Sequence, residues 1–296
     1  MSKAVHSNRL LPYVLLLPAF VVLGLVIFYP MAYSMVNSTF NTPAYQRAAQ
    51  FIGTKNYESV LKDARFYDAL WRTVIWTVGC TGLQYIVGLA LALLLNSKVR
   101  AVAWFRPFYI LPWIIPGVVA AMAFRFMYAN DVGLINVTLR SIGLGSLARA
   151  WIANPDTAML AALLLGAWKG FPFYMIMLLA GLQNIPVELI EAARIDGASG
   201  RAVLRRVILP LLAPISSITL LLGIIWTSNY FDGIYLLTGG GPARATETLP
   251  IYIYNTGLVS FDLPRASAAS VILLVIVTVL ASVYLFIQQR NVRANA

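Results

Sequence analysis

Long stretches without a charged residue constrain this chain more than any other feature. Residues 11–29 carry no charge over 19 positions, and residues 73–95 carry none over 23. A helix rises about 1.5 Å per residue, so about 20 apolar residues cross a hydrocarbon core about 30 Å thick. Both stretches are long enough to span a membrane. The sequence therefore predicts an all-α membrane protein.

Further apolar runs bring the expected number of membrane spans to six, at about 11–33, 73–95, 107–128, 157–182, 208–231 and 266–289. The composition agrees, because 60% of the 296 residues are hydrophobic and only 11% are charged, whereas soluble proteins average about 25% charged. The first run resembles a signal peptide, but it is too long and lacks a cleavage site of small residues. We expect one transmembrane domain over residues 1–296, with long outer loops at 34–71, 129–156 and 232–265.

Lysine and arginine residues gather in alternate loops, which sets the expected orientation. With the N-terminus inside, the cytoplasmic segments hold eleven Lys and Arg residues against three acids, and the outer loops hold nine against eight. Arg125 and Lys169 lie within spans, so the three groups contribute +8, +1 and +2 to the formal net charge of +11. Short cytoplasmic loops carry such an excess. We therefore expect both termini and the loop at 186–209 in the cytoplasm, and no nucleic-acid partner.

Proline and glycine residues interrupt several spans, and Pro112, Pro116 and Gly117 fall together in the third. We expect them to kink helices and to let backbones approach closely, as a substrate cavity requires. For any single glycine or proline, however, the ordinary composition of membrane helices is a sufficient explanation.

The segment 191–214 is the most polar run between two apolar stretches, and it has the pattern of two short helices. Pro186 suits the first turn of a helix, the residues up to Asp196 favour helix, and Gly197 breaks it. A second helix is expected over 201–209, ending at Pro210. By spacing alone, the segment fits a surface that binds another protein and an ordinary solvated loop equally well.

The residues of this loop resemble the EAA motif of binding-protein-dependent ATP-binding-cassette importers. The matching segments are Glu191-Ala192-Ala193, Asp196-Gly197-Ala198 and Val207-Ile208-Leu209-Pro210, with Val207 where an isoleucine is usual. In that family the loop is a coupling helix, seated in a cleft of the cytoplasmic ATPase. The resemblance implies a type I permease bundle of six transmembrane helices, and it assigns ATPase coupling to Glu191, Ala192, Ala193, Asp196 and Gly197.

The same resemblance implies an assembly in the bacterial inner membrane. A second homologous permease subunit would complete the pathway, two ATPase subunits would hydrolyse ATP with Mg, and an extracytoplasmic binding protein would deliver the substrate. This chain itself would bind no cofactor and no metal. It has no phosphate-binding loop G-x-x-x-x-G-K-[ST], and it has one histidine, His6, and one cysteine, Cys80. We therefore do not expect it to be an enzyme.

A second set of motifs resembles the carbohydrate-uptake branch of these importers, which includes permeases for maltose-type oligosaccharides, polyols and glycerol 3-phosphate. The motifs lie at 179–186, 230–242 and 246–249. The match extends from about residue 111 to residue 261, whereas the N-terminal third matches only in hydropathy. The implied function is the ATP-driven import of a sugar or sugar derivative.

Sugar sites combine aromatic faces with hydrogen-bonding side chains in a partly desolvated cavity. Three clusters within the expected spans supply both, at 112–117, 168–172 and 223–230. In the maltose transporter of the resembled family the corresponding positions contact sugar. That assigns substrate binding to Trp113, Gly117, Lys169, Gly170, Gly223, Trp226, Thr227 and Tyr230. Helix packing is the competing role for each of these residues.

Lys169 is a charge near the middle of a span, and on insertion scales such a charge costs roughly 2.5–3.5 kcal/mol. A partner or a function is therefore expected for its ammonium. The ammonium can face the cavity and bind an acidic group of the substrate. Alternatively, it can reach the interface or pair with the second permease subunit. The sequence leaves these alternatives open, and with them the identity of the sugar.

A secondary sugar transporter driven by an ion gradient is the alternative function. Such a transporter is expected to carry carboxylates within its spans to couple protons or sodium. The expected spans contain none, because Asp131, Asp156 and Asp232 all lie at span edges. The sequence therefore favours the ATP-driven permease.

The charge asymmetry predicts a topology that reporter fusions can measure. Fusions after Lys98 and after Arg201 are expected to report the cytoplasm, because the flanking loops carry the excess of positive charge. Fusions at Asn56 and Asn136 are expected to report the outer side. A cytoplasmic signal at Asn136 would contradict the six-span arrangement.

Overall fold

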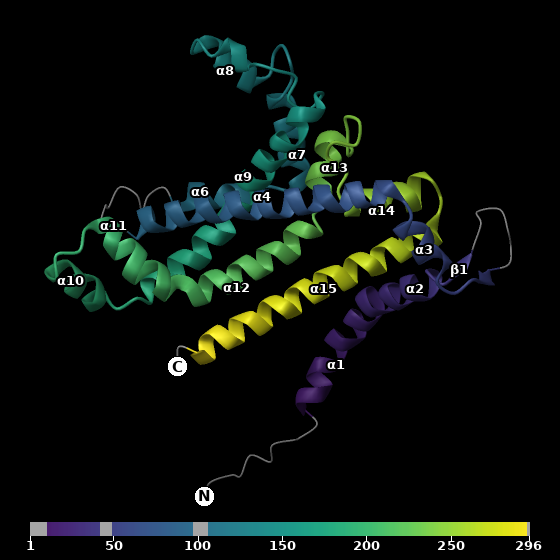
Figure 1. Ribbon diagram of the computed structural model, residues 1–296, viewed down its shortest axis with the longest axis horizontal. Coiled ribbons are helices and arrows are strands. Elements are labelled where there is room, and N and C mark those ends of the chain that lie inside the picture. The colour runs from purple at the N-terminus through teal and green to yellow at the C-terminus, as the bar shows by residue number, and fades with distance from the viewer. Residues whose placement is uncertain (1–10, 42–48, 97–105, 295–296) are drawn as a thin grey trace, which may run out of the picture. The chain divides into compact units, whose positions relative to one another are not determined.

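The computed structural model describes residues 11–41, 49–96 and 106–294. Two compact units make up the chain. Unit 1 comprises the residues up to Ala64 together with Ile253–Val275, and unit 2 comprises Arg65–Tyr252 and the residues from Ile276 onward. Figure 1 labels the helices; α12 and all of α4 from Arg65 onward belong to unit 2.

Unit 1 holds the first apolar helix, a short hairpin and the beginning of the last helix. Its elements are α1 (Leu11–Leu23), a π-helical turn (Gly24–Phe28), α2 (Tyr29–Asn37), β1 (Phe40–Asn41), β2 (Gln50–Phe51), α3 (Lys55–Leu61), a second π-helical turn (Asn255–Val259) and the start of α15 (Leu263–Ala294). The strands pair antiparallel, with Phe40 opposite Phe51. Asp63 accepts a hydrogen bond from Arg265 at 2.7 Å, which joins α15 to the segment after α3.

Unit 2 contains the remaining helices. They are α4 (Ala64–Leu95), α6 (Arg106–Ile114), α7 (Gly117–Met127), α8 (Leu134–Ser141), α9 (Pro155–Gln183), α10 (Val187–Ile195), α11 (Gly200–Val203), α12 (Leu209–Ser228), α13 (Asp232–Thr238) and α14 (Leu249–Tyr254), with a 3-10 turn at Gly145–Leu147 and a π-helical turn at Leu204–Ile208. Helix α7 packs against α13, and α9 packs against both α6 and α12. The segments expected as outer loops therefore contain short helices, which sequence periodicity over so few residues does not reveal.

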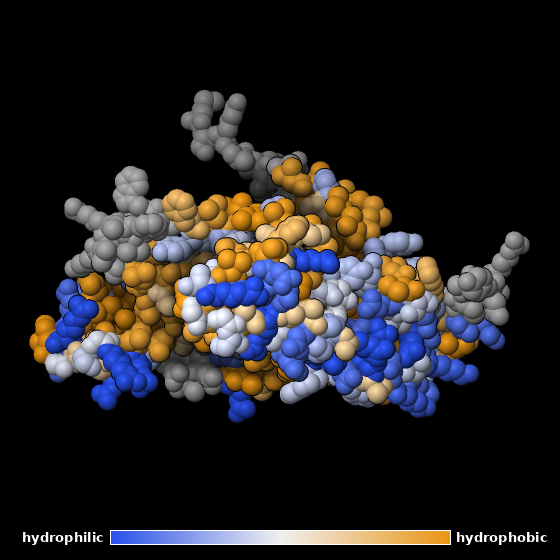
Figure 2. Space-filling model, turned by 90° about the horizontal axis from the view of Figure 1, so that it is seen from above, coloured by the Kyte–Doolittle hydropathy of each residue, from blue (hydrophilic) through white to orange (hydrophobic). Residues whose placement is uncertain are grey.

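Five helices among the described residues are long and apolar enough to cross a membrane, and a bent pair makes a sixth candidate. Many of their large hydrophobic side chains are exposed, and Figure 2 shows hydrophobic residues over much of the visible surface. In Tyr13–Asn37 none of the most apolar window is buried, and in Leu263–Gln288 only 6% of it is. Exposed apolar helices of this length belong in lipid.

The third expected span, 107–128, is not one straight helix. Helices α6 and α7 meet at an angle of 99° across a break at Ile115 and Pro116. Pro116 has an extended backbone, with φ −54° and ψ 140°, and it cannot donate a hydrogen bond to α6. Pro112 and Pro116 thus lie at a break that is sharper than the kink we expected.

Small residues bring α9 against α4. Ala158, Ala162, Gly166 and Gly170 recur every four residues and lie on one face of α9. At Gly166 an added Cβ would lie 2.6 Å from both Cys80 Sγ and Trp76 Cη2. The helices approach closely because no side chain separates them, as is common between membrane helices.

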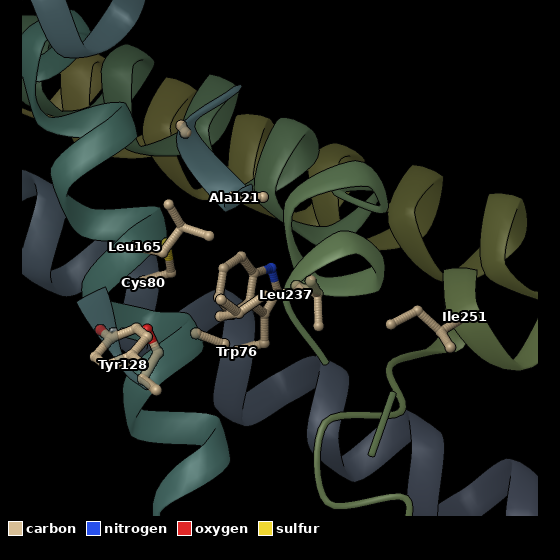
Figure 3. Close-up of a cluster of buried hydrophobic side chains, with 11 residues drawn as sticks. Trp76, Cys80, Ala121, Tyr128, Leu165, Leu237 and Ile251 are labelled. Atoms are coloured by element: carbon tan, nitrogen blue, oxygen red, sulfur yellow. Dashed lines mark hydrogen bonds between the residues drawn. The ribbon is translucent and has the colours of Figure 1, made fainter. Parts of the chain in front are cut away.

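The core of unit 2 is built around Trp76 of α4 (Figure 3). Trp76 is 1% exposed and packs in one cluster with Cys80, Tyr128, Leu165 and Leu237. Its indole N–H donates to the backbone oxygen of Thr227 at 2.9 Å, and the Tyr128 hydroxyl donates to Ala161 O at 3.0 Å. The lone cysteine therefore lies in the packed core, as its apolar sequence context indicates.

The helix expected over 201–209 does not end at Pro210, contrary to that expectation. From Gly200 to Ser228 the chain is continuously helical and passes through the π-helical turn. In that turn Leu209 N–H bonds to Leu204 O, five residues back. Pro210 lies in the first turn of α12. The wider turn leaves room for a proline ring, which an uninterrupted α-helix would exclude.

We predict that Gly166→Ala destabilises the protein whereas Gly82→Ala does not. Both changes raise helix propensity by about 1 kcal/mol. Gly82 has nothing within 4 Å of an added Cβ, whereas Gly166 meets Trp76 and Cys80. Overpacking costs about 1–3 kcal/mol. Thermal unfolding of the purified protein in detergent should therefore show a lower Tm for Gly166→Ala only, and equal Tm values would argue against the close packing of α4 and α9.

Candidate functional site

A cavity of about 230 Å³ lies among α4, α6, α9 and the C-terminal end of α12, all within unit 2. Its lining is dominated by aromatic rings and contains a single charged side chain. The lining residues are Trp76, Cys80, Gln84, Trp113, Gly166, Lys169, Gly170, Phe173, Tyr174, Gly223, Trp226, Thr227 and Tyr230.

The aromatic rings of the cavity support one another. Phe173 lies between Trp226 and Trp113, with ring centroids 4.9 Å and 6.4 Å away. Trp226 and Trp113 are 54% and 50% exposed, and both line the cavity. On the other wall, Tyr230 stacks on the buried Trp76 with centroids 5.9 Å apart. Two accessible indole faces are thus held by a layer of packed rings.

Two glycines let polar side chains lie close against the helices around the cavity. A Cβ at Gly223 would lie 1.5 Å from the Tyr174 hydroxyl, and one at Gly170 would lie 2.2 Å from Gln84 Nε2. Gln84 itself donates to Gly166 O at 2.8 Å. The absence of a side chain at Gly170 and Gly223 therefore sets the positions of Gln84 and Tyr174.

Lys169 projects from α9 toward the break between α6 and α7. Its ammonium donates to Pro112 O at 3.0 Å and to Trp113 O at 2.9 Å, and it also donates to Ile115 O. These partners are backbone carbonyls of this chain, which the sequence did not indicate, and Lys169 also lines the cavity. The positive charge of Lys169 is therefore offset by backbone carbonyls and not by a carboxylate.

The structure brings together seven of the eight residues expected to contact sugar. Only Gly117 is outside the lining; an added Cβ there would lie 3.8 Å from the Tyr230 hydroxyl. Sequence analysis did not single out the other lining residues, which are Trp76, Cys80, Gln84, Gly166, Phe173 and Tyr174. A usable signal was present on α4, since Trp76, Cys80 and Gln84 recur every four residues and share one helix face.

The loop before α12 forms a defined turn. Glu191, Ala192 and Ala193 lie in α10, Asp196 caps its C-terminus, and Gly197 has φ +81°. Ala198 N–H donates to Ala193 O at 2.9 Å and Gly197 N–H donates to Arg194 O at 3.1 Å. This is the Schellman pattern, in which a left-handed residue closes a helix. Ile195 is 86% exposed beside it, so α10 presents an apolar side chain at its end.

A second turn follows α13, in the segment 239–242 that carries the carbohydrate-branch motif. Gly239 and Gly240 have φ +64° and +89°, and the hydroxyls of Thr238 and Thr246 lie 2.6 Å apart. Next in the chain, the buried Glu247 accepts a hydrogen bond from Arg65 Nε at 2.9 Å. The motif thus forms a fixed turn that is tied to the start of α4.

Among the described residues no three His, Cys, Asp or Glu side chains are grouped to hold a metal ion.

The described residues form apolar helices long enough to span a membrane, a broken span and an exposed helical loop. Residues 84–294 match the model of the family described as binding-protein-dependent transport system inner membrane component. The chain belongs to this family. It is the membrane permease subunit of an ATP-binding-cassette importer, and the alternative of a secondary transporter is wrong.

Similar proteins agree with this family over nearly the whole chain. The sn-glycerol-3-phosphate transport system permease protein UgpA of Agrobacterium fabrum is 34% identical and is covered to 99%, with 98% of this chain aligned. The trehalose/maltose transport system permease protein MalF of Thermococcus litoralis is 33% identical, covering 96% of this chain and 95% of the relative.

A solved structure shows the same fold. A chain of a bacterial ABC transporter involved in the import of the acidic polysaccharide alginate superposes with a TM-score of 0.83, at 22% identity and 96% coverage of both chains. The expected fold class, an all-α importer permease bundle, is confirmed.

Proposed function

We propose that this chain carries a sugar or sugar derivative across the bacterial inner membrane, through the aromatic cavity of unit 2. The chain is one of two homologous permease subunits in the proposed assembly. Two cytoplasmic ATPase subunits bind ATP and Mg, and an extracytoplasmic binding protein delivers the sugar. The permease itself binds no cofactor and makes or breaks no covalent bond.

The observation that carries this proposal is the pair of open indole faces in the cavity. Sugars present flat C–H surfaces, which pack on aromatic rings, and hydroxyls, which need hydrogen-bonding groups nearby. Trp113 and Trp226 supply the faces, while Gln84, Thr227 and Tyr230 supply polar atoms. The names of the relatives support the same substrate class, since one is a glycerol-3-phosphate permease and another a trehalose/maltose permease.

ATP hydrolysis drives the cycle from outside this chain. We propose that Glu191, Ala192, Ala193, Asp196 and Gly197 form the surface that an ATPase subunit grips. The exposure of Ile195 and the fixed turn at Gly197 support this role, because a rigid, partly apolar helix end can seat in a cleft. Closure of the ATPases would then rock the bundle and open the cavity alternately to the two sides.

Trp226→Ala should weaken sugar uptake by the reconstituted transporter. Loss of one aromatic face removes about 0.5–1.5 kcal/mol beyond lost area, or roughly a two- to tenfold rise in the apparent KM. Trp226→Phe should retain most of the uptake. Trp71→Ala is the matched control, because Trp71 is 64% exposed and lies outside the lining of the cavity.

Radiolabelled sugar uptake into proteoliposomes gives the rates, and basal ATP hydrolysis reports assembly. Loss of assembly by Trp226→Ala, with no separate defect in uptake, would assign Trp226 to packing. An unchanged KM in Trp226→Ala would remove it from the sugar site.

Glu191→Ala should uncouple ATP hydrolysis from substrate. Hydrogen bonds to charged groups contribute about 1.5–3 kcal/mol, so stimulated hydrolysis should fall roughly tenfold or more. Glu188→Ala is the control, since Glu188 is also exposed on α10 but lies outside the EAA motif. If Glu191→Ala and Glu188→Ala both keep the substrate-stimulated ATP hydrolysis of the unmodified protein, the loop has no coupling role.

A further inference from the structure

The break between α6 and α7 leaves backbone carbonyls without their usual partners. In a continuous helix Pro112 O would accept from the N–H of residue 116, but that residue is proline and has no N–H. Trp113 O would accept from Gly117 N–H, but Gly117 begins α7 beyond the 99° bend. In a membrane such carbonyls must be satisfied by the protein or by water in a cavity, since lipid offers no donor.

Lys169 of α9 supplies the missing donors. A lysine ammonium has three N–H groups, and Lys169 directs them to Pro112 O, Trp113 O and Ile115 O. The C-terminal end of a helix also carries partial negative charge, which favours a cation at this place. One side chain therefore satisfies the end of α6 and has its own charge offset.

By binding these carbonyls, Lys169 caps the C-terminal end of α6, and this cap adjoins the wall of the cavity. Trp113 is both the residue whose carbonyl Lys169 binds and a ring that lines the cavity, half exposed and packed beside Phe173. Because all three ammonium protons are engaged by carbonyls, none is left to donate to a substrate anion.

We propose that Lys169 is a positioning residue, which caps α6 across the break and holds Trp113 against the substrate cavity. It does not bind an acidic group of the substrate. The identification of Trp113 as part of a sugar site rests on the proposed function, whereas the cap itself depends only on the hydrogen bonds to the broken helix.

The test compares Lys169→Met, which keeps length and loses all donors, with Lys169→Arg, which keeps charge and donors. Uptake of a neutral sugar, maltose, and of an anionic one, glycerol 3-phosphate, is measured with the assembled transporter. Whichever of the two is transported, Lys169→Met should lower its uptake about tenfold or more, and Lys169→Arg should restore most of it. If both sugars are transported, a loss confined to the anionic one would overturn the proposal; if only one is transported, unchanged uptake by Lys169→Met would overturn it.

A second measurement is independent of transport. Trp113→Cys is introduced as a reporter, and maleimide labelling is compared with and without Lys169→Met; the native Cys80 is fully buried. We expect the labelling rate at position 113 to change several-fold. A reporter at Leu144→Cys, on an exposed loop residue of the same unit, should be unchanged. An unchanged rate at position 113 would overturn the proposal even if no sugar is transported.

Should Lys169→Met be lost from the membrane, Pro116→Ala provides a suppressor. It returns an N–H at position 116, which can bond to Pro112 O in place of the ammonium. Recovery of the membrane-inserted protein in the double variant supports the cap. If Pro116→Ala does not restore the membrane-inserted protein, and Lys169→Arg is lost from the membrane to the same extent as Lys169→Met, the proposal is overturned.

Discussion

The need to satisfy every backbone carbonyl inside lipid governs the centre of this permease. Pro116 removes one donor and turns the chain, which frees the carbonyls at the end of α6. The three hydrogen bonds from Lys169 then join α9 to that end. A charge and a broken helix, each costly in a membrane, offset each other here, and the aromatic cavity lies beside the point where they meet.

Close packing between α4 and α9 gives the cavity its other walls. Gly166 and Gly170 remove side chains from α9, so Trp76, Cys80 and Gln84 of α4 lie directly against its backbone. Trp76 then supports Tyr230, while Phe173 supports the two open indoles. The exposed rings of the cavity are thereby held by rings packed beside them, so they need little ordering before a ligand can bind.

Much of this organisation could be predicted from the sequence, because apolar length, loop charge and the EAA segment are local signals. The sequence also marked Lys169, Pro112 and Pro116 as unusual. It did not pair them, since the hydrogen bonds join residues more than fifty positions apart. Trp76 and Gln84 escaped notice because an aromatic and an amide on a membrane helix face fit ordinary packing. Likewise, Pro210 suggested a helix end where a π-helical turn lets the helix continue.

That continuation makes Gly200–Ser228 a single rod of 29 residues. At about 1.5 Å per residue it is roughly 40 Å long. One end adjoins the turn at Gly197, and the other carries Gly223, Trp226 and Thr227 into the cavity wall. A continuous helix of this length can act as a lever. A tilt of a few degrees about its middle would move its two ends by an ångström or more in opposite directions, so a movement of the loop would reach the cavity wall.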